Sequence, residues 1–244
     1  MTETAGQDGR DHYDVTGGGP VLLVLPGGAG HPMGLGPLVE RLASRFTVVT
    51  YDPLGLAHGR LGLPVAEQRV ADWSEGAHRV LEAVLPEGEP AYVFGTSSGG
   101  IAVLDLLARH PGRLAHVVAH EPPCVTVLPD GAERRAELIG QLEGSGRPAA
   151  EGGSATPMGV FLARVLHPFT RYAPAAVPAG ASLTLAAGAD SRGQVLYRTA
   201  EFLAERLGGA FTEFPGGHLG TLEHPVEFAD RLAESLLSGA RSSS

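Results

Sequence analysis

Apolar residues follow two alternating patterns along this chain: short continuous runs and longer stretches with a helical period. The short runs predict buried β-strands at Pro20–Leu25, Phe46–Tyr51, Ala91–Phe94, Leu114–His120, Ser182–Ala187 and Phe211–Phe214. The longer stretches repeat every 3.6 residues and predict helices at Leu35–Ala43, Val65–Val84, Ser98–Arg109, Val195–Leu207 and Pro225–Leu237. Strands and helices that alternate in this way predict an α/β fold, with a mainly parallel central sheet flanked by helices.

One long segment, residues 122–180, interrupts the alternation because it contains no convincing strand. Two stretches within it, Asp130–Leu142 and Val160–Leu166, have a helical pattern. An insertion of this length between two strands of one sheet is usually functional, so we expect a short helical lid. The predicted organisation is a flexible tail at 1–11, a core at 12–121 and 181–237, the lid at 122–180 and a second tail at 238–244.

A tight turn with a serine at its centre joins the third predicted strand to the helix that follows it. The turn reads Gly95-Thr96-Ser97-Ser98-Gly99, a G-x-S-x-G pattern in the strand–turn–helix context that a nucleophile elbow requires. The glycine-flanked frame makes Ser97 the candidate nucleophile. Ser98 is a rival, because Thr96 and Gly100 are also small, and a serine that only caps the helix is the simpler alternative.

A glycine-rich loop follows the first predicted strand and reads Pro26-Gly27-Gly28-Ala29-Gly30. Attack by a serine on a carbonyl group creates an oxyanion, which backbone N–H groups must stabilise. The N–H groups of Gly28 and Ser98 are our candidates for this oxyanion hole. A dinucleotide-binding turn is excluded, because Met33 stands where the last glycine of G-x-G-x-x-G would be.

A serine nucleophile needs a base, and the base needs a carboxylate that orients it. His218 is the candidate base, since it lies in a glycine-rich loop after the last predicted strand. Two acidic residues, Asp190 and Glu121, follow the fifth and fourth predicted strands. We prefer Asp190, which gives the chain order serine, aspartate, histidine, and keep Glu121 as the alternative.

Composition removes several classes of function. Hydrophobic residues make up 43% of the 244 residues, enough for a real core, and the net charge of −9 disfavours a nucleic-acid binder. All 18 basic residues are arginines, which excludes every mechanism that needs a lysine, including Schiff-base and P-loop chemistry. The single cysteine, Cys124, excludes an internal disulfide, and His116 and His120 are too far apart on one strand to chelate a metal. A polar, acidic N-terminus and short apolar runs predict a cytoplasmic protein.

Taken together, these residues resemble the serine-hydrolase branch of the α/β-hydrolase superfamily over about residues 12–237. The resemblance is carried by an oxyanion-loop motif, a nucleophile elbow, an acid turn and a base loop: Leu25-Pro26-Gly27-Gly28, Gly95–Gly99, Gly188-Ala189-Asp190 and Gly216-Gly217-His218. It implies a lid where residues 122–180 stand, and Glu121 occupies the position of a known variant of the acid. The loop Asp52-Pro53-Leu54-Gly55 departs from the Asp-Arg-x-Gly of many members.

The expected function is cleavage of an ester-like bond (ester, thioester or lactone) in a small, largely apolar molecule through an acyl-serine intermediate. A carbon–carbon bond hydrolase would use the same residues. The alternative from another class is a non-catalytic small-molecule receptor on the same fold. We expect a small-molecule substrate, no cofactor, no metal, and no contact with nucleic acid or membrane; no pattern in the chain indicates an oligomeric state.

Overall fold

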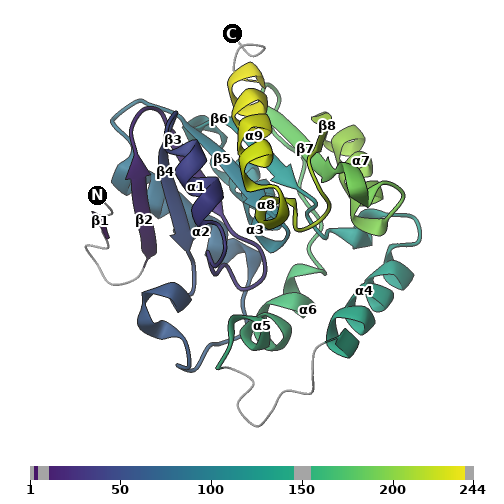
Figure 1. The fold of residues 1–244 in the computed structure, drawn as a ribbon. Coiled ribbons are helices and arrows are strands. Elements are labelled where there is room, and N and C mark those ends of the chain that lie inside the picture. Colours follow the sequence, from purple (N-terminus) through teal and green to yellow (C-terminus); the bar gives the residue numbers. More distant parts are fainter. Residues whose placement is uncertain (1–2, 5–10, 146–154, 240–244) are drawn as a thin grey trace.

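The computed structural model describes residues 3–4, 11–145 and 155–239, and these form one sheet with helices on both faces (Figure 1). The eight strands lie in the order β1-β2-β4-β3-β5-β6-β7-β8. All neighbouring pairs from β4 to β8 are parallel, whereas β1–β2 and β2–β4 are antiparallel. The strand bounds are β1 Glu3–Thr4, β2 His12–Gly17, β3 Val21–Leu25, β4 Thr47–Asp52, β5 Ala91–Thr96, β6 Leu114–His120, β7 Leu183–Gly188 and β8 Ala210–Phe214.

The six predicted strands are confirmed as β3 to β8, and the fold class with them. The prediction missed β1 and β2, the two strands at the antiparallel edge of the sheet. In β2, Tyr13 is buried and its neighbours are half-buried, as expected for a strand near the edge of a sheet. The polar–apolar alternation from His12 to Thr16 was the signal for it.

The helix bounds are α1 Gly36–Leu42, α2 Val70–Val84, α3 Ser98–Arg109, α4 Gly131–Ser145, α5 Pro157–Val160, α6 Leu166–Phe169, α7 Val195–Leu207, α8 Gly220–Glu223 and α9 Pro225–Gly239. Five helices, α1, α3, α4, α7 and α9, follow the predicted stretches closely, whereas the second helix starts later than predicted. The predicted helix Val160–Leu166 is a π-helical turn, Phe161–Val165, between the short helices α5 and α6, and α8 was not predicted. The second helix begins at Val70 and not at Val65, because the backbone N–H of Gln68 donates to the carbonyl of Arg164 and the preceding residues are not helical.

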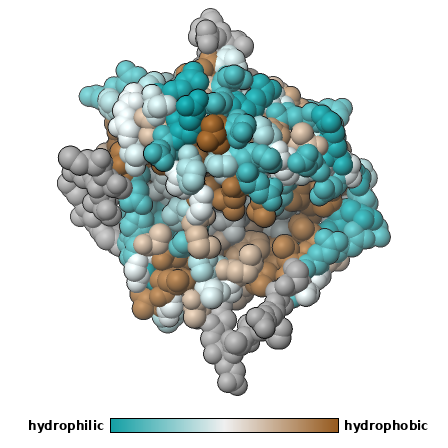
Figure 2. All heavy atoms as spheres, in the orientation of Figure 1, coloured by the Kyte–Doolittle hydropathy of each residue, from teal (hydrophilic) through white to brown (hydrophobic). Residues whose placement is uncertain are grey.

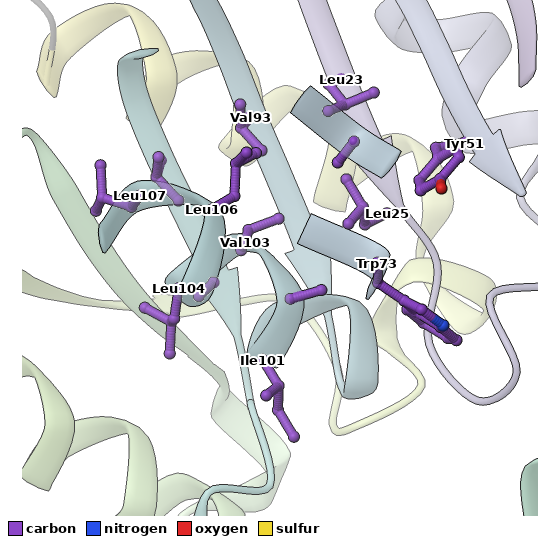
Figure 3. Close-up of a cluster of buried hydrophobic side chains, with 14 of the residues drawn as sticks. Leu23, Leu25, Tyr51, Trp73, Val93, Ile101, Val103, Leu104, Leu106 and Leu107 are labelled. Atoms are coloured by element: carbon purple, nitrogen blue, oxygen red, sulfur yellow. The ribbon is translucent and has the colours of Figure 1, made fainter. Parts of the chain in front are cut away.

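The core has two layers, one on each face of the sheet. Helices α1 and α9 cover one face, where their Leu38 and Phe228 side chains pack with alternate residues of β3. Helices α2, α3 and α7 cover the other face, where α2 and α3 pack against β3, α3 also packs against β5, and α7 packs against β7. Figure 3 shows this second layer, which brings side chains of α3, such as Val103, together with Val93 of β5 and Leu25 of β3. The central parallel strands are therefore apolar on both faces, which explains the continuous apolar runs in the sequence.

Residues 122–180 form the predicted helical segment, which contains no strand in its described part. Helices α4, α5 and α6 lie together beyond one end of the sheet (Figure 1). The segment is fastened to the core where Tyr172 donates a hydrogen bond to the buried carboxylate of Asp105, at 2.9 Å, and where Phe169 packs edge-on against Trp73. Residues 146–154 of the predicted lid lie outside the described residues, as do 1–2 and 5–10 of the first predicted tail and 240–244 of the second.

No helix in the described ranges combines the length and the apolar character that crossing a membrane requires. The predicted second tail begins later than expected, because α9 continues to Gly239. That the core, the lid and the tails are separate units of the chain stays a prediction.

One buried histidine should make the fold sensitive to acid. His116 on β6 contacts the hydroxyls of Ser182 and Thr184, and burial lowers its pKa from 6.5 to about 4. The unfolded chain takes up a proton below about pH 6.5, whereas the folded chain does so only near pH 4. The free energy of unfolding should therefore fall as the pH drops through this window, by up to about 3 kcal/mol from this residue, and should be unaffected above it.

Denaturant unfolding of the parent and of His116→Gln, measured from pH 7 to pH 4, checks this expectation. The variant should lose stability less steeply than the parent as the pH falls, because glutamine does not titrate. The exposed His224 offers a control, and His224→Gln should keep the parent's slope. Equal slopes for His116→Gln and the parent would contradict the account.

Candidate active site

The predicted elbow is present, and Ser97 stands at its apex in a strained conformation. Ser97 lies between the end of β5 and the first residue of α3, with φ of 54° and ψ of −123°. Among the described residues, only Ser97 and Glu121 are non-glycine residues with positive φ. Such conformations cost about 1–3 kcal/mol each and are concentrated at functional sites.

The two glycines of the elbow are required by close backbone contacts. A side chain at Gly95 would meet the carbonyl oxygen of Gly99 at 2.4 Å, and one at Gly99 would meet the carbonyl oxygen of Leu25 at 2.1 Å. These distances are far below van der Waals contact. The G-x-S-x-G spacing therefore follows from the close packing of the turn against β3.

The imidazole of His218 lies between Ser97 and Glu121. Its Nε2 is 3.2 Å from the Ser97 hydroxyl, and its Nδ1 is 2.8 Å from the Glu121 carboxylate. Ser97 follows β5, Glu121 follows β6, and His218 follows β8, so the three side chains meet at the carboxyl ends of the parallel strands. This is the geometry of a nucleophile, a base and an orienting acid.

The structure corrects the preference for Asp190 as the partner of His218. The Asp190 side chain is exposed, and its backbone N–H donates to the carbonyl of Gly216, at 3.0 Å. Asp190 therefore holds the loop that carries His218 and does not orient the ring. The turn that contains Asp190 contacts Glu121 instead, because the N–H of Gly188 donates to the Glu121 carboxylate at 2.9 Å.

Glu121 is wholly buried, yet its surroundings favour the charged form. Burial alone raises the pKa of the carboxyl, but hydrogen bonds from His218 and Ser191 and the charges of His120 and His218 outweigh it, so the net pKa lies below its usual value. The carboxylate is therefore ionised wherever the imidazole can act as a base. An ionised partner stabilises the imidazolium that forms when a serine loses its proton.

The two candidate donors of the oxyanion hole, Gly28 and Ser98, lie side by side near Ser97. The Ser98 hydroxyl donates to the Gly28 carbonyl at 2.6 Å, and so joins the loop after β3 to the first turn of α3. A side chain at Gly27 would come within 3.0 Å of the Ser97 Cβ atom, which shows how closely this loop approaches the elbow. The Ser98 N–H belongs to the first turn of α3, where backbone donors have no partner within the helix.

These residues line a cavity of about 530 Å³ between the sheet and the helical segment. Ser97, Ser98, Gly28 and His218 contribute to its wall, and apolar side chains supply most of the rest: Met33, Leu35, Leu138, Leu142, Met158, Phe161, Leu166, Phe169, Leu196, Leu219 and Leu222. Figure 2 shows hydrophobic side chains gathered between the core and α4–α6 on this face. No Asp, Glu or Arg lines the cavity within the described part of the chain.

Sequence reasoning missed His31, which also lines the cavity. The backbone N–H of Met33 donates to its Nδ1 at 3.1 Å, so in the neutral ring the proton is on Nε2. Its place in the same glycine-rich loop as Gly28 was the available signal. Across the described ranges, no group of three or more His, Cys, Asp or Glu side chains is placed to hold a metal ion.

Comparison with known proteins agrees with this architecture. The model of the alpha/beta hydrolase fold family matches residues 20–172, more than half of the chain. The uncharacterized hydrolase YraK of Bacillus subtilis is 31% identical, and the match covers 92% of each chain.

Two solved structures share the fold. The carboxylesterase CesB from Bacillus subtilis is 21% identical with a TM-score of 0.60, over 98% of this chain and 92% of CesB. The enol-lactonase from Burkholderia xenovorans LB400 is 17% identical with a TM-score of 0.61, over 96% of this chain and 100% of the lactonase. The fold, the family model and the full-length similarity to YraK together lead to one conclusion: this chain belongs to the α/β-hydrolase fold family.

Proposed function

We propose that this protein is a serine hydrolase that cleaves an ester-like bond in a small, neutral, largely apolar molecule. The observation that carries the proposal is the His218 ring, which reaches Ser97 through Nε2 and Glu121 through Nδ1 at the wall of an apolar cavity. The similarity to hydrolases, among them a carboxylesterase and a lactonase by fold, supports the same class of reaction.

In the proposed reaction the Ser97 hydroxyl oxygen attacks the carbonyl carbon of the substrate, and its proton passes to His218 Nε2. The N–H groups of Gly28 and Ser98 stabilise the oxyanion, helped by the positive end of the α3 dipole. The tetrahedral intermediate collapses as His218 returns the proton to the leaving oxygen or sulfur. A water molecule then gives a proton to His218 and attacks the carbonyl carbon of the acyl-serine. His218 passes this proton to the Ser97 oxygen as the bond to the acyl group breaks, which releases the acid and restores both side chains.

Glu121 takes the part of the orienting acid in this scheme. With Nδ1–H donating to the carboxylate, the lone pair of Nε2 faces Ser97, and this is the tautomer that can accept a proton. The carboxylate is itself held by the N–H of Gly188, so its position is fixed by the neighbouring strand β7. The site is therefore preorganised before a substrate binds.

The apolar wall of the cavity supports the proposed class of neutral substrates. A charged group buried without a partner is strongly disfavoured, and the described wall contains no Asp, Glu or Arg that could pair with one. Residues of α4, α5 and α6 form a large part of this wall, so we assign the helical segment 122–180 the role of a lid. Neutral esters with an apolar acyl or alcohol part should therefore be hydrolysed faster than their charged counterparts.

A charge introduced on the cavity side of α4 should impair the hydrolysis of such esters. Leu138 lines the cavity, and Leu138→Asp should lower kcat/KM for a neutral p-nitrophenyl ester by roughly 10-fold, because apolar contact area with the substrate is lost. Ala136 lies on the exposed side of the same helix and provides a matched control. Ala136→Asp adds the same charge and should keep the parent's kcat/KM.

Measuring kcat/KM for neutral and anionic esters of equal length with the parent and both variants completes the test. A parent that prefers the anionic ester would refute the proposed substrate class. Equal losses in the two variants would show that α4 does not act through the cavity.

A further inference from the structure

A second buried histidine, His120, lies directly beneath the candidate active site and takes no direct part in the proposed reaction. It is the last residue of β6 and has no exposed surface. Its Nδ1 is 3.2 Å from the hydroxyl of Thr96, the last residue of β5. Glu121 follows His120 and Ser97 follows Thr96, and these are the two non-glycine residues with positive φ among the described residues.

The backbone also joins the ends of β5 and β6. The N–H of Ser97 donates to the carbonyl of His120 at 2.9 Å, so the two strand ends are joined by a main-chain and a side-chain hydrogen bond. The His120 ring also packs edge-on against Phe228 of α9 and at a tilt against Phe214, the last residue of β8. Phe214 begins the loop that carries His218. This side chain stands at the end of the strand that leads to Glu121, and it contacts the ends of the two strands that lead to Ser97 and His218.

This histidine comes at a cost to the fold. Its Nε2 is buried and has no hydrogen-bond partner among the described residues, and burial lowers the pKa of the ring to about 4. The ring is therefore neutral at the pH where a histidine base can work. An apolar residue would fill this site without burying the unpaired Nε2 atom.

We propose that His120 is a positioning residue for the transfer of a proton from Ser97 to His218. Its hydrogen bond to Thr96 holds the strained residues that follow β5 and β6, and its contact with Phe214 holds the start of the loop that carries His218. The inference rests on the proposed function. It accounts for a polar side chain at a buried site where an apolar one would pack.

Two substitutions at this position separate positioning from stability. His120→Leu replaces the ring with an apolar side chain of similar size, which cannot bond to Thr96. His120→Asn keeps a polar atom at the position of Nδ1 and leaves a small void. His120→Leu should be at least as stable to heat as His120→Asn, yet its kcat should be roughly 10- to 100-fold below that of the parent with KM unchanged. His120→Asn should be the less stable of the two and should retain more of the parent's kcat.

Thr96→Val removes the same hydrogen bond by changing the threonine and leaving His120 in place. It provides the test if the substitutions of His120 disturb packing. Its kcat should fall as in His120→Leu, and the double variant Thr96→Val with His120→Leu should be no slower than either single variant. The measurements are thermal unfolding, kcat and KM on a p-nitrophenyl ester, and the rate of labelling by a fluorophosphonate.

The results distinguish this inference from the function on which it rests. Parent protein that neither hydrolyses the ester nor reacts with the phosphonate overturns the proposed function and this inference with it. Parent protein that reacts, together with folded His120→Leu and Thr96→Val that react at the parent's rate, overturns the positioning role alone. An activity ranking that simply follows thermal stability also overturns it.

Discussion

Glu121→Gln should lower kcat about 10⁴-fold while the protein remains folded. The Glu121 carboxylate accepts hydrogen bonds on both oxygens, from the N–H of Gly188 and from His218 Nδ1. A glutamine can accept only one of them with its single amide oxygen. If it keeps the bond to Gly188, its NH₂ group faces Nδ1 and favours the tautomer with the proton on Nε2, which cannot accept the proton of Ser97.

Asp190→Asn is the matched control for this substitution, because it makes the same chemical change on the next strand of the sheet. The Asp190 side chain is exposed, and its contact with the loop of His218 is made by the backbone. Its kcat should change by about tenfold at most. The measurement is kcat on one neutral ester, with circular dichroism to verify the fold; the reverse ranking would return the role of the acid to Asp190.

Ser97→Ala should have the largest effect, a loss of kcat of about 10⁵- to 10⁶-fold. The hydroxyl that contacts His218 Nε2 belongs to Ser97, so the variant lacks the proposed nucleophile. The elbow should fold as before, since alanine differs from serine only by the hydroxyl group. Steady-state hydrolysis of a neutral ester measures this loss.

Ser98→Ala is the control for Ser97→Ala, since the two residues are adjacent. The Ser98 hydroxyl is buried and donates to the Gly28 carbonyl, whereas its backbone N–H is retained in the variant. A substantial part of the activity should therefore survive. If Ser98→Ala lost as much activity as Ser97→Ala, the assignment of the nucleophile to Ser97 would be contradicted.

The sheet from β3 to β8 was predictable because most of its strands are apolar on both faces and its helices on one, and both patterns are visible in a single sequence. The strand β2 escaped detection because it is only partly buried and has no continuous apolar run. The start of α2 depends on a hydrogen bond between Gln68 and Arg164, which lie far apart in the sequence. Local periodicity contains no information about such a contact.

The elbow and His218 were predictable because each has a local signature, a glycine-flanked serine and a glycine-rich loop. The choice of the acid was wrong for a reason of geometry. Chain order favoured Asp190, but β6 lies between β5 and β7 in the sheet, so Glu121 is on the strand next to Ser97. The Glu121 carboxylate is buried beside His218 and Asp190 is exposed, and no pattern of residue types reveals that difference.

Mass spectrometry of the protein after reaction with a fluorophosphonate tests the central claim most directly, because only an activated serine reacts rapidly with this probe. The account predicts one adduct per chain, on Ser97, and its loss in Ser97→Ala and in His218→Ala. An adduct on Ser98, or a folded protein that remains unlabelled as a non-catalytic receptor would, is the result that would contradict it.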